Sequence, residues 1–506
     1  MTVHVAGRAV PLGPRAALRA VRREVADTPR PLRLWFTVLI GLCLVGAVGA
    51  ALSLPPGWEV LGTTPTFEWG ILITAYVFFA ITTSGLCLAS SLGTVFGIEM
   101  FLPLEKRHAL LALLSLVTAF GVIALDLHYP VRMVLGAILS PSPTSPMWWM
   151  GVFYGIYLVF LCTEVWSMFT GHWGVHRVAC TLSSITAVFA PTTLGAVFGV
   201  IAARPYWHGA FTPPAMVTEA LLSGIALLGI VFYLVHRYRL VGWERATTLA
   251  IPAIRLLLTI ALAVAILVVT WQTLFSLYGS VPGLVDATRA LLVGPQAPYW
   301  WLFRVLIGLA VPMVLLAVPR TRTPGGLFAA SAMVFVGVFF DRFVFVNVGQ
   351  IAPSTAVAGV VSRPYADYTP SPVEISIVVG AFAFLALGYT LAERYLPMHE
   401  HEGHVAGVFG GTSHPALAGA AAHAGPTIEA AGADLKTPAA DDHELEEAGG
   451  QTPAWPRASV QDTAPVVVPG AAAVRPSDAV PDEPAVRPSD AVPDEPFDVD
   501  DPGGAT

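Results

Sequence analysis

The residues best suited to chemistry lie in one short stretch, from Asp126 to Trp149, between two long apolar segments. The stretch carries a carboxylic acid (Asp126), an imidazole (His128) and a guanidinium (Arg132) close together. Ionisable groups at the edge of hydrocarbon are costly and therefore indicate function. An acid and an imidazole can exchange protons with a bound molecule, and an arginine can orient the acid. The alternative is a charge-capped loop in which Asp126 and Arg132 form a structural ion pair.

Membrane helices must position these groups, because the chain has the composition of a multi-pass membrane protein. It has 506 residues, of which 55% are hydrophobic and only 12% are charged. Only helices or closed barrels satisfy the backbone within lipid, and the alternating pattern of barrel strands is absent. Runs of about 20 apolar residues therefore predict an all-α integral membrane protein with about ten transmembrane helices. These are expected near residues 34–54, 69–97, 108–127, 148–170, 177–203, 215–237, 251–278, 300–318, 327–346 and 373–396.

The two ends of the chain differ from its apolar middle. Residues 1–33 are polar and basic, with seven arginines, and are predicted to be a cytoplasmic N-terminal segment. Residues 399–506 are acidic and rich in Pro and Ala, and the sequence AVRPSDAVPDEP occurs in them twice. Such a composition buries no core, so this C-terminal tail is expected to be disordered. Lys and Arg are more frequent in the loops on the side of the N-terminus, which predicts that both termini are cytoplasmic.

Most ionisable groups of the predicted spans lie toward the outer face, at the depth of Asp126. A transporter with a binding site at the midplane would place polar groups and broken helices at the centre, so this distribution disfavours a transporter. A ring bound near the outer face, with its apolar tail in lipid, suits the distribution. Quinones have this shape, and their redox chemistry needs an acid or an imidazole beside the ring oxygens. The outer polar groups are Glu68, Asp126, His128, Glu219, Gln272, Arg304, Asp341, Arg342 and Glu374.

Two further sites are candidates for proton relay. Glu164 lies deeper in the membrane than the other acids, and it is either a relay toward the cytoplasm or a packed structural acid. The second candidate is the acid–base pair Asp341 and Arg342 in the ninth span. The relay from Glu164 is expected to continue through neighbouring hydroxyl groups, namely those of Thr163, Ser167, Thr192 and Thr193.

No haem and no metal site is expected on this chain. The four cysteines form no CxxC or CxxCH motif, which disfavours a c-type haem and an iron–sulfur cluster. A haem inside a helical bundle needs facing histidines within the helices, whereas the histidines here lie at the ends of the spans. Electrons from a quinone near the outer surface are therefore expected to pass to a partner chain.

Three separated motifs resemble those of one family of membrane proteins. Residues 126–132 (DLHYPVR), followed by 141–147 (PSPTSPM), resemble the DLxxPxR…PxxxSPM pattern of the NrfD/polysulfide reductase membrane-subunit family, including its HybB and alternative complex III branches. Residues 193–199 (TLGAVFG) resemble the SLGxLFG stretch of its fifth helix. Residues 368–374 (YTPSPVE), before a last helix that ends in YLP, resemble the YxPSxxE…LP ending of the HybB-like branch. The likeness covers roughly residues 35–398.

The resemblance implies a quinone-interacting membrane subunit of a respiratory oxidoreductase complex. Two four-helix bundles, here about 69–203 and 215–346, would be flanked by a first and a tenth helix within a domain of residues 34–398. Menaquinone or ubiquinone would be bound as a substrate, with no haem or metal on the chain. The family's functional acid at the outer end of the third span maps to Asp126. His128 stands where many relatives have Gly, and the histidine that HybB-like relatives carry before SLG is absent here.

The resemblance also implies partners and a cellular location. The expected partner is an extracytoplasmic ferredoxin-like iron–sulfur subunit, in a complex that can include a molybdopterin, hydrogenase or cytochrome c subunit. Membrane lipid would surround the spans, and no nucleic-acid partner is expected. The expected location is the bacterial inner (plasma) membrane, and electron exchange could be coupled to proton movement. The alternatives are a membrane anchor without quinone chemistry and a polytopic transporter.

Overall fold

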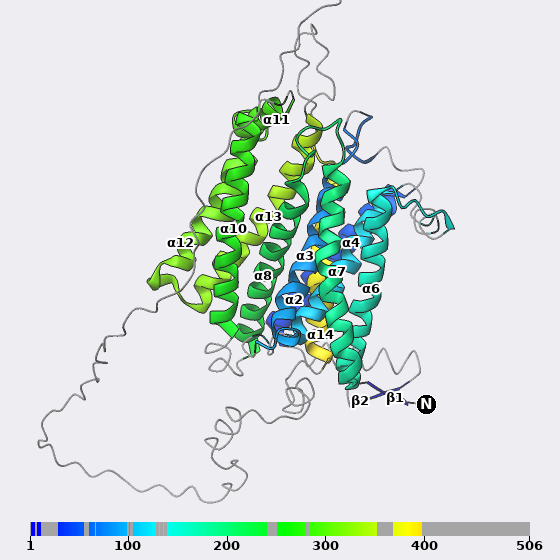
Figure 1. The fold of residues 1–506 in the computed structure, drawn as a ribbon. Helices are drawn as coiled ribbons and strands as arrows, with labels where there is room; N and C mark the ends of the chain where they lie inside the picture. The colour runs from blue at the N-terminus through cyan, green and yellow to red at the C-terminus, as the bar shows by residue number, and fades with distance from the viewer. Residues whose placement is uncertain are drawn as a thin grey trace, which may run out of the picture. The chain divides into compact units, whose positions relative to one another are not determined.

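Within the described residues, ten helical segments of the computed structural model are long and apolar enough to cross a membrane, at the positions that the apolar runs predict (Figure 1). The structure describes residues 2–5, 8–11, 29–54, 60–65, 67–98, 101, 105–127, 131, 135, 139–239, 250–279, 281, 283–351 and 368–396. The prediction of an all-α membrane protein with ten transmembrane helices is confirmed. The predicted disordered tail and most of the predicted basic N-terminal segment lie outside the described residues.

The spanning segments alternate in direction along the chain. They are α2 (Arg30–Ser53), α3 (Ile71–Thr94), α4 (Glu105–Asp126), α6 (Pro146–Thr170), α7 (Trp173–Gly199), α8 (Thr212–Arg239), α10 (Ile251–Tyr278), η4 (Tyr299–Ala310) continued by α12 (Val311–Ala317), α13 (Pro324–Ile351) and α14 (Pro372–Tyr395). Four shorter elements were not predicted. They are α11 (Leu284–Leu292), the single turn η5 (Pro319–Thr321) and the strands β1 (Thr2–Val5) and β2 (Arg8–Pro11), which pair as an antiparallel hairpin outside the spans.

The eighth span differs from the regular helix that its apolar run predicts. Its first part, η4, is a π-helix of 12 residues, and α12 continues it as an α-helix. π-helical segments are rare, and they are found frequently at functional sites. The middle of η4 carries Arg304, whose side chain is fully buried.

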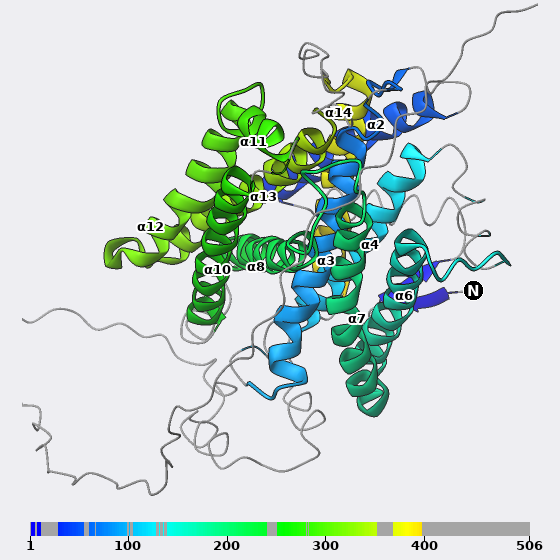
Figure 2. The same cartoon turned by 45° about the horizontal axis from the view of Figure 1, so that its top comes forward.

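The spanning helices form two four-helix bundles that meet along α3 and α8. In the first bundle, α3 packs against α4 and α7, and α6 packs against α7. In the second bundle, α8 packs against α10 and α13, and α13 packs against η4 and α12. Figure 2 shows α3 and α8 side by side between these two groups of helices. The remaining helices, α2 and α14, pack on each other, and α14 also packs against α4. The predicted arrangement of two bundles with flanking first and tenth helices is confirmed.

Glycine allows the two bundles to approach closely. At the crossing of α3 and α8, a Cβ atom on Gly85 would overlap the carbonyl group of Ala220, and a Cβ atom on Gly224 would overlap the backbone of Gly85. Small residues at such crossings allow backbones to come into contact within a membrane. Two other helix pairs use the same device, with Gly46 against Gly380 between α2 and α14 and Gly308 against Gly337 between η4 and α13.

Both ends of the bundles carry polar groups, and they are named here after α4. The Asp126 end is the one at which α4, α7, α10 and α13 end and α3, α8 and α14 begin. The Glu105 end is the opposite one, at which α4 begins. The sequence predicts that the Asp126 end faces outward.

Candidate functional site

Asp126, the acid predicted to exchange protons with a quinone, is the last residue of α4 and is half-buried. Its carboxyl group lies close enough to Glu374 and Tyr368 to interact with them electrostatically. Its carboxyl oxygens have no hydrogen-bond partner within the described part of the chain. His128 and Arg132 lie outside the described residues, so their roles, and the alternative ion pair between Asp126 and Arg132, stay predictions.

Glu374 is held by a network that joins the beginnings of α3 and α14. It is fully buried, and its side chain and that of Ser371 form a capping box at the start of α14. Its Oε2 accepts the N–H group of Gly62 at 3.0 Å and that of Ser371 at 2.8 Å. Its Oε1 accepts the hydroxyl of Tyr368 at 3.0 Å, and the Tyr368 oxygen accepts the N–H group of Ile71 at 2.7 Å. Glu374 is therefore fully engaged, in contrast to the carboxyl group of Asp126.

Tyr368 is a fixed, protonated group beside this acid. Burial and the neighbouring Glu374 carboxylate raise the pKa of Tyr368, so its phenol stays protonated at neutral pH. Its ring stacks on that of Phe67, with ring centroids 4.7 Å apart. Since its hydroxyl both donates and accepts a hydrogen bond, Tyr368 positions Glu374.

Trp69 connects this end of the first bundle to the second bundle. The backbone N–H group of Trp69 donates to Oε1 of Gln350 on α13 at 2.9 Å, and Gln350 Nε2 donates to the Trp69 carbonyl at 2.9 Å. The Trp69 ring stacks on that of Trp207, with centroids 5.0 Å apart. Trp207 Nε1 in turn donates to the carbonyl of Phe345 on α13 at 2.8 Å. The two bundles are therefore connected at the Asp126 end by hydrogen bonds between side chains and the main chain and by ring contacts.

Glu164, the predicted relay, is fully buried on α6. Its Oε2 accepts the hydroxyl of Ser183 on α7 at 2.5 Å, and Ser183 Oγ accepts the thiol of Cys87 at 3.5 Å. The hydroxyls predicted to continue the path are not used in this way, because hydroxyls within a helix readily bond to carbonyls of the preceding turn. These hydroxyls donate instead to carbonyls of their own helices: Thr163 to Val159, Ser167 to Glu164, Thr192 to Val188, and Thr193 to Phe189 and Ala190.

A buried cluster continues from Glu164 toward the Glu105 end. His176 Nε2 lies 2.7 Å from Oε1 of Glu105, and the Thr94 hydroxyl donates to the same oxygen. All three side chains are buried. Glu105 and His176 also interact electrostatically with Glu164. The first bundle therefore holds two buried pairs of polar side chains, Glu164 with Ser183 and His176 with Glu105, between the interior of the bundle and the end opposite Asp126.

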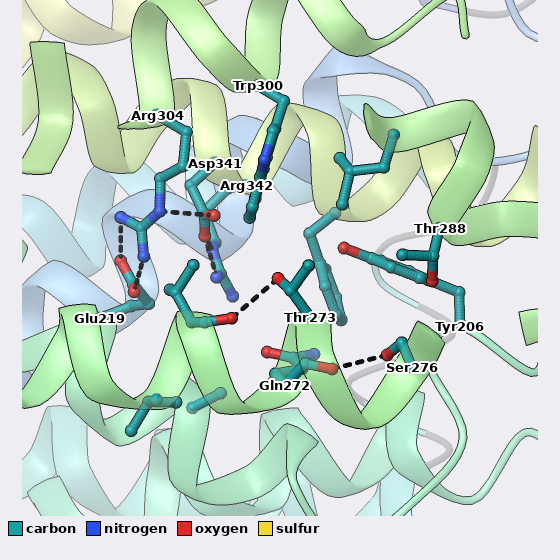
Figure 3. A pocket seen from close by; sticks show the side chains of 15 residues that line it. Tyr206, Glu219, Gln272, Thr273, Ser276, Thr288, Trp300, Arg304, Asp341 and Arg342 are labelled. Carbon is teal, nitrogen blue, oxygen red and sulfur yellow. Dashed lines mark hydrogen bonds and ion pairs between the residues drawn. The ribbon is translucent and has the colours of Figure 1, made fainter. Parts of the chain in front are cut away.

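Asp341 and Arg342 belong to a cluster of four buried charges in the second bundle (Figure 3). Arg304 on η4 forms a bidentate ion pair with Glu219 on α8, with NH1 3.1 Å from Oε2 and NH2 on Oε1. Arg304 Nε lies 3.0 Å from Oδ1 of Asp341. Arg342 donates from Nε to Oδ2 of Asp341 at 3.1 Å and from NH2 to the same oxygen. The two carboxylates and two guanidiniums cancel in charge, and the relay role predicted for Asp341 and Arg342 stays a prediction.

The sequence places Glu219, Arg304 and Glu374 toward the outer face, and it predicts no role for them. That Arg304 and Glu219 each have a charged partner could have been predicted, since a charge inside a membrane needs one. That they pair with each other could not have been predicted, because they are 85 residues apart and the contact depends on how η4 and α8 are rotated. The Ser371-x-x-Glu374 spacing before an apolar run is the signature of a capping box and could have identified the role of Glu374.

Comparison with known protein families identifies the whole arrangement. Residues 59–354 match the family described as polysulphide reductase, NrfD. This match is more than half of the chain and includes every helix from α3 to α13. The chain belongs to the polysulphide reductase NrfD family. The predicted resemblance is thereby confirmed, and both bundles lie inside the family region.

Several curated proteins resemble this NrfD-family chain over most of their length. A selenate reductase subunit from Mesobacillus selenatarsenatis is 22% identical over 72% of this chain and 94% of its own. A putative dimethyl sulfoxide reductase membrane subunit from Halobacterium salinarum is 27% identical, over 72% and 91%. The Hdr-like menaquinol oxidoreductase integral membrane subunit of Archaeoglobus fulgidus is 25% identical, over 71% and 92%. The names of these relatives describe subunits of oxidoreductases.

Proposed function

We propose that this NrfD-family protein is the quinone-interacting membrane subunit of a respiratory oxidoreductase complex. In this proposal it exchanges electrons between the quinone pool, menaquinone or ubiquinone, and an extracytoplasmic iron–sulfur partner. The observation that carries the proposal is the state of Asp126, a half-buried acid at the end of a spanning helix with no hydrogen-bond partner among the described residues. The relative named as a menaquinol oxidoreductase subunit supports the same substrate class.

Asp126 is the residue proposed to exchange protons with the ring oxygens. When a quinol is oxidised, its hydroxyl protons must leave together with the electrons, and a nearby carboxylate can accept them. In the opposite direction the same carboxyl group donates. Tyr368 and Glu374 are hydrogen-bonded to each other and to the backbone. In this proposal they form the fixed surface beside Asp126 against which the quinone ring lies. His128 is proposed as a second proton-exchanging group and Arg132 as the residue that orients Asp126.

The electrons are proposed to leave at the Asp126 end. The partner there is a ferredoxin-like iron–sulfur subunit, in a complex that includes a catalytic subunit of the molybdopterin, hydrogenase or cytochrome c type. In this arrangement the Asp126 end faces away from the cytoplasm of a bacterial cell, and both termini are cytoplasmic. Relatives named as subunits of selenate and dimethyl sulfoxide reductases support a complex of several different chains.

Proton movement is proposed to use the buried chain of the first bundle. Glu164, hydrogen-bonded to Ser183, and the pair of His176 and Glu105 are all buried, and Glu164 interacts electrostatically with His176 and Glu105. Carboxyl and imidazole groups that lie near one another can exchange protons, directly or through a bridging water. The chain would therefore connect the interior of the first bundle with the cytoplasmic side.

Binding of a quinone analogue tests the proposed site. The full-length protein in detergent is titrated under anaerobic conditions with reduced menadione, the quinol form, and quenching of its tryptophan fluorescence is followed. We expect saturable quenching in the wild type and an affinity about tenfold or more weaker in Asp126→Asn, because the quinol hydroxyl then donates to a neutral amide oxygen in place of a charged carboxylate. Asp286→Asn is the matched control, since Asp286 lies on α11 at the same end with its side chain 67% exposed. Wild-type affinity in Asp126→Asn would contradict the site and favour a membrane anchor without quinone chemistry.

A further inference from the structure

The interior of the first bundle holds hydroxyl groups that the proposed function does not use. They lie on the faces that α3 and α6 turn toward each other, as two hydrogen bonds between these helices indicate. Tyr157 on α6 donates to the Thr83 carbonyl of α3 at 3.1 Å, and Tyr76 on α3 donates to the sulfur of Met150 on α6 at 3.5 Å. Both bonds join residues 74 positions apart, as in two parallel helices that lie in register.

The polar side chains of this interior continue inward as far as Glu164. Tyr157, Leu161 and Glu164 are fully buried and recur at intervals of three and four residues, so they share one face of α6. Leu161 is the apolar member of this face, and at its depth α3 and α7 supply polar groups. The Tyr157 hydroxyl lies close enough to the Cys87 thiol to interact with it. Cys87 donates to Ser183 Oγ at 3.5 Å, and Ser183 donates to Glu164.

Two buried hydroxyls of this interior lack a hydrogen-bond partner in the described part of the chain, namely those of Tyr154 on α6 and Ser84 on α3. A hydroxyl within a helix readily donates to a carbonyl of the preceding turn, as those of Thr82 and Thr83 do. The two unpartnered hydroxyls lie close enough to interact with each other. A buried hydroxyl without a partner lowers stability, so Phe and Ala would fill these two positions at less cost.

The unpartnered pair lies between two groups of polar side chains. Tyr154 interacts electrostatically with Tyr76 on one side and with Tyr157 on the other. Tyr76 is the sixth residue of α3, so it lies roughly 8 Å along that helix from the Asp126 end. A hydroxyl accepts a proton on its oxygen as it donates its own. A small rotation of the Ser84 side chain toward Tyr154 makes the missing hydrogen bond and joins the two groups.

We propose that Tyr154 and Ser84 carry protons between the Asp126 end of the first bundle and Glu164. A proton that reaches the Tyr154 oxygen replaces the phenol proton, which passes to Ser84 and from there toward Glu164. Each hydroxyl therefore ends with the one proton with which it began, and transfer in the opposite direction follows the same steps in reverse. The proposal rests on the proposed function in taking Glu164 as the group that exchanges protons with the cytoplasmic side. It extends that route across the bundle.

Charge translocation by the reconstituted complex tests the proposal. Translocation is followed with a voltage-sensitive dye in proteoliposomes, and electron transfer is followed as reduction of the partner's clusters by reduced menadione. Tyr154→Phe and Ser84→Ala should each slow translocation about tenfold, because each removes a proton-carrying hydroxyl, and leave electron transfer within about threefold of wild type. Ser331→Ala is the matched control, since the Ser331 hydroxyl is also buried without a partner among the described residues but lies on α13 in the second bundle.

Thermal unfolding separates this role from a structural one. Tyr154→Phe and Ser84→Ala remove hydroxyls that form no hydrogen bond within the described ranges, so the midpoint of unfolding should stay at the wild-type value or rise. A lower midpoint, with electron transfer and translocation slowed equally, would make the pair structural and overturn the proposal.

The other outcomes separate the proposal from the proposed function. Wild-type translocation in both variants would overturn the route through Tyr154 and Ser84 and leave the quinone site standing. Normal electron transfer without any translocation by the wild-type complex would overturn the proton route and, again, leave the quinone site standing. An absence of electron transfer from the quinol in the wild type would overturn the proposed function, and the route with it.

Discussion

The two bundles use buried ionisable groups in opposite ways. In the first bundle the groups lie at different depths, with Glu105 and His176 near one end and Glu164 farther inside. Asp126 lies at the other end, without a hydrogen-bond partner among the described residues. In the second bundle four charged side chains form ion pairs with one another, and Arg304 lies between Glu219 and Asp341. A chain of neutralisable groups can pass protons, whereas a closed, charge-neutral cluster resists any change in protonation. This difference supports the proposed proton transfer in the first bundle and leaves the second bundle with a closed, charge-neutral cluster.

The largest expected effect concerns the closed cluster. Replacing Arg304 with Met leaves Glu219 and Asp341 without their shared guanidinium, and removing one partner of a buried pair typically costs about 3–5 kcal/mol. We expect the free energy of unfolding in detergent to fall by this amount, measured by denaturant titration. Arg289→Met is the control, because the Arg289 side chain is 66% exposed and should change stability by less than about 0.5 kcal/mol. Equal losses in the two variants would remove the distinction between the bundles.

The next effect sharpens the role of the first bundle. Glu164→Gln should slow charge translocation by reconstituted complex about a hundredfold, since the amide cannot carry the proton, while electron transfer itself stays within about threefold of wild type. Translocation is measured with a voltage-sensitive dye in proteoliposomes. Thr163→Val is the control, because the Thr163 hydroxyl is bound to the Val159 carbonyl and lies outside the chain of groups. Translocation at the wild-type rate in Glu164→Gln would show that the chain is structural.

A smaller effect is expected where the two bundles meet. Leu in place of Gly224 overlaps the backbone of α3 at Gly85, and such overpacking typically costs about 1–3 kcal/mol. We expect a lower midpoint of thermal unfolding together with weaker binding of the quinone analogue, since the two bundles are displaced relative to each other. Gly155→Leu is the matched control, because a Cβ atom on Gly155 has no neighbour within 4 Å. A normal midpoint in Gly224→Leu would mean that the bundles are not coupled through this crossing.

The smallest effect concerns the capping box of Ser371 and Glu374, which lies beside Asp126. Ser371→Ala removes the hydroxyl that accepts the Glu374 N–H group, and loss of an N-cap typically costs about 1 kcal/mol. Hydrogen exchange at the first turn of α14 should increase about fivefold, measured by mass spectrometry. Ser376→Ala is the control, since the Ser376 hydroxyl donates only to the Val373 carbonyl within the same helix. Unchanged exchange in Ser371→Ala would show that Glu374 is held without the cap.

The sequence predicted the features that depend on local composition, and it missed those that depend on how helices face one another. Apolar runs located the ten spans because length and hydropathy alone define them. The acids and arginines near the span ends could be found in the same way. The closure of Arg304 on Glu219 and Asp341 could not, because it depends on the rotation of three helices and on the π-helical η4. The hydroxyl partner of Glu164, Ser183, was not predicted, because which hydroxyl of α7 faces Glu164 depends on the rotation of that helix.

The most direct test of the account is the rate at which a quinol reduces the iron–sulfur partner in the intact complex. Stopped-flow absorbance of the partner's clusters is followed after mixing with reduced menadione, for the wild type, Asp126→Asn and Asp286→Asn. Loss of a positioned proton acceptor should slow the reaction by about a hundredfold or more in Asp126→Asn and leave the Asp286→Asn rate unchanged. Equal rates in all three proteins would contradict the assignment of proton transfer to Asp126 and, with it, the role given to the first bundle.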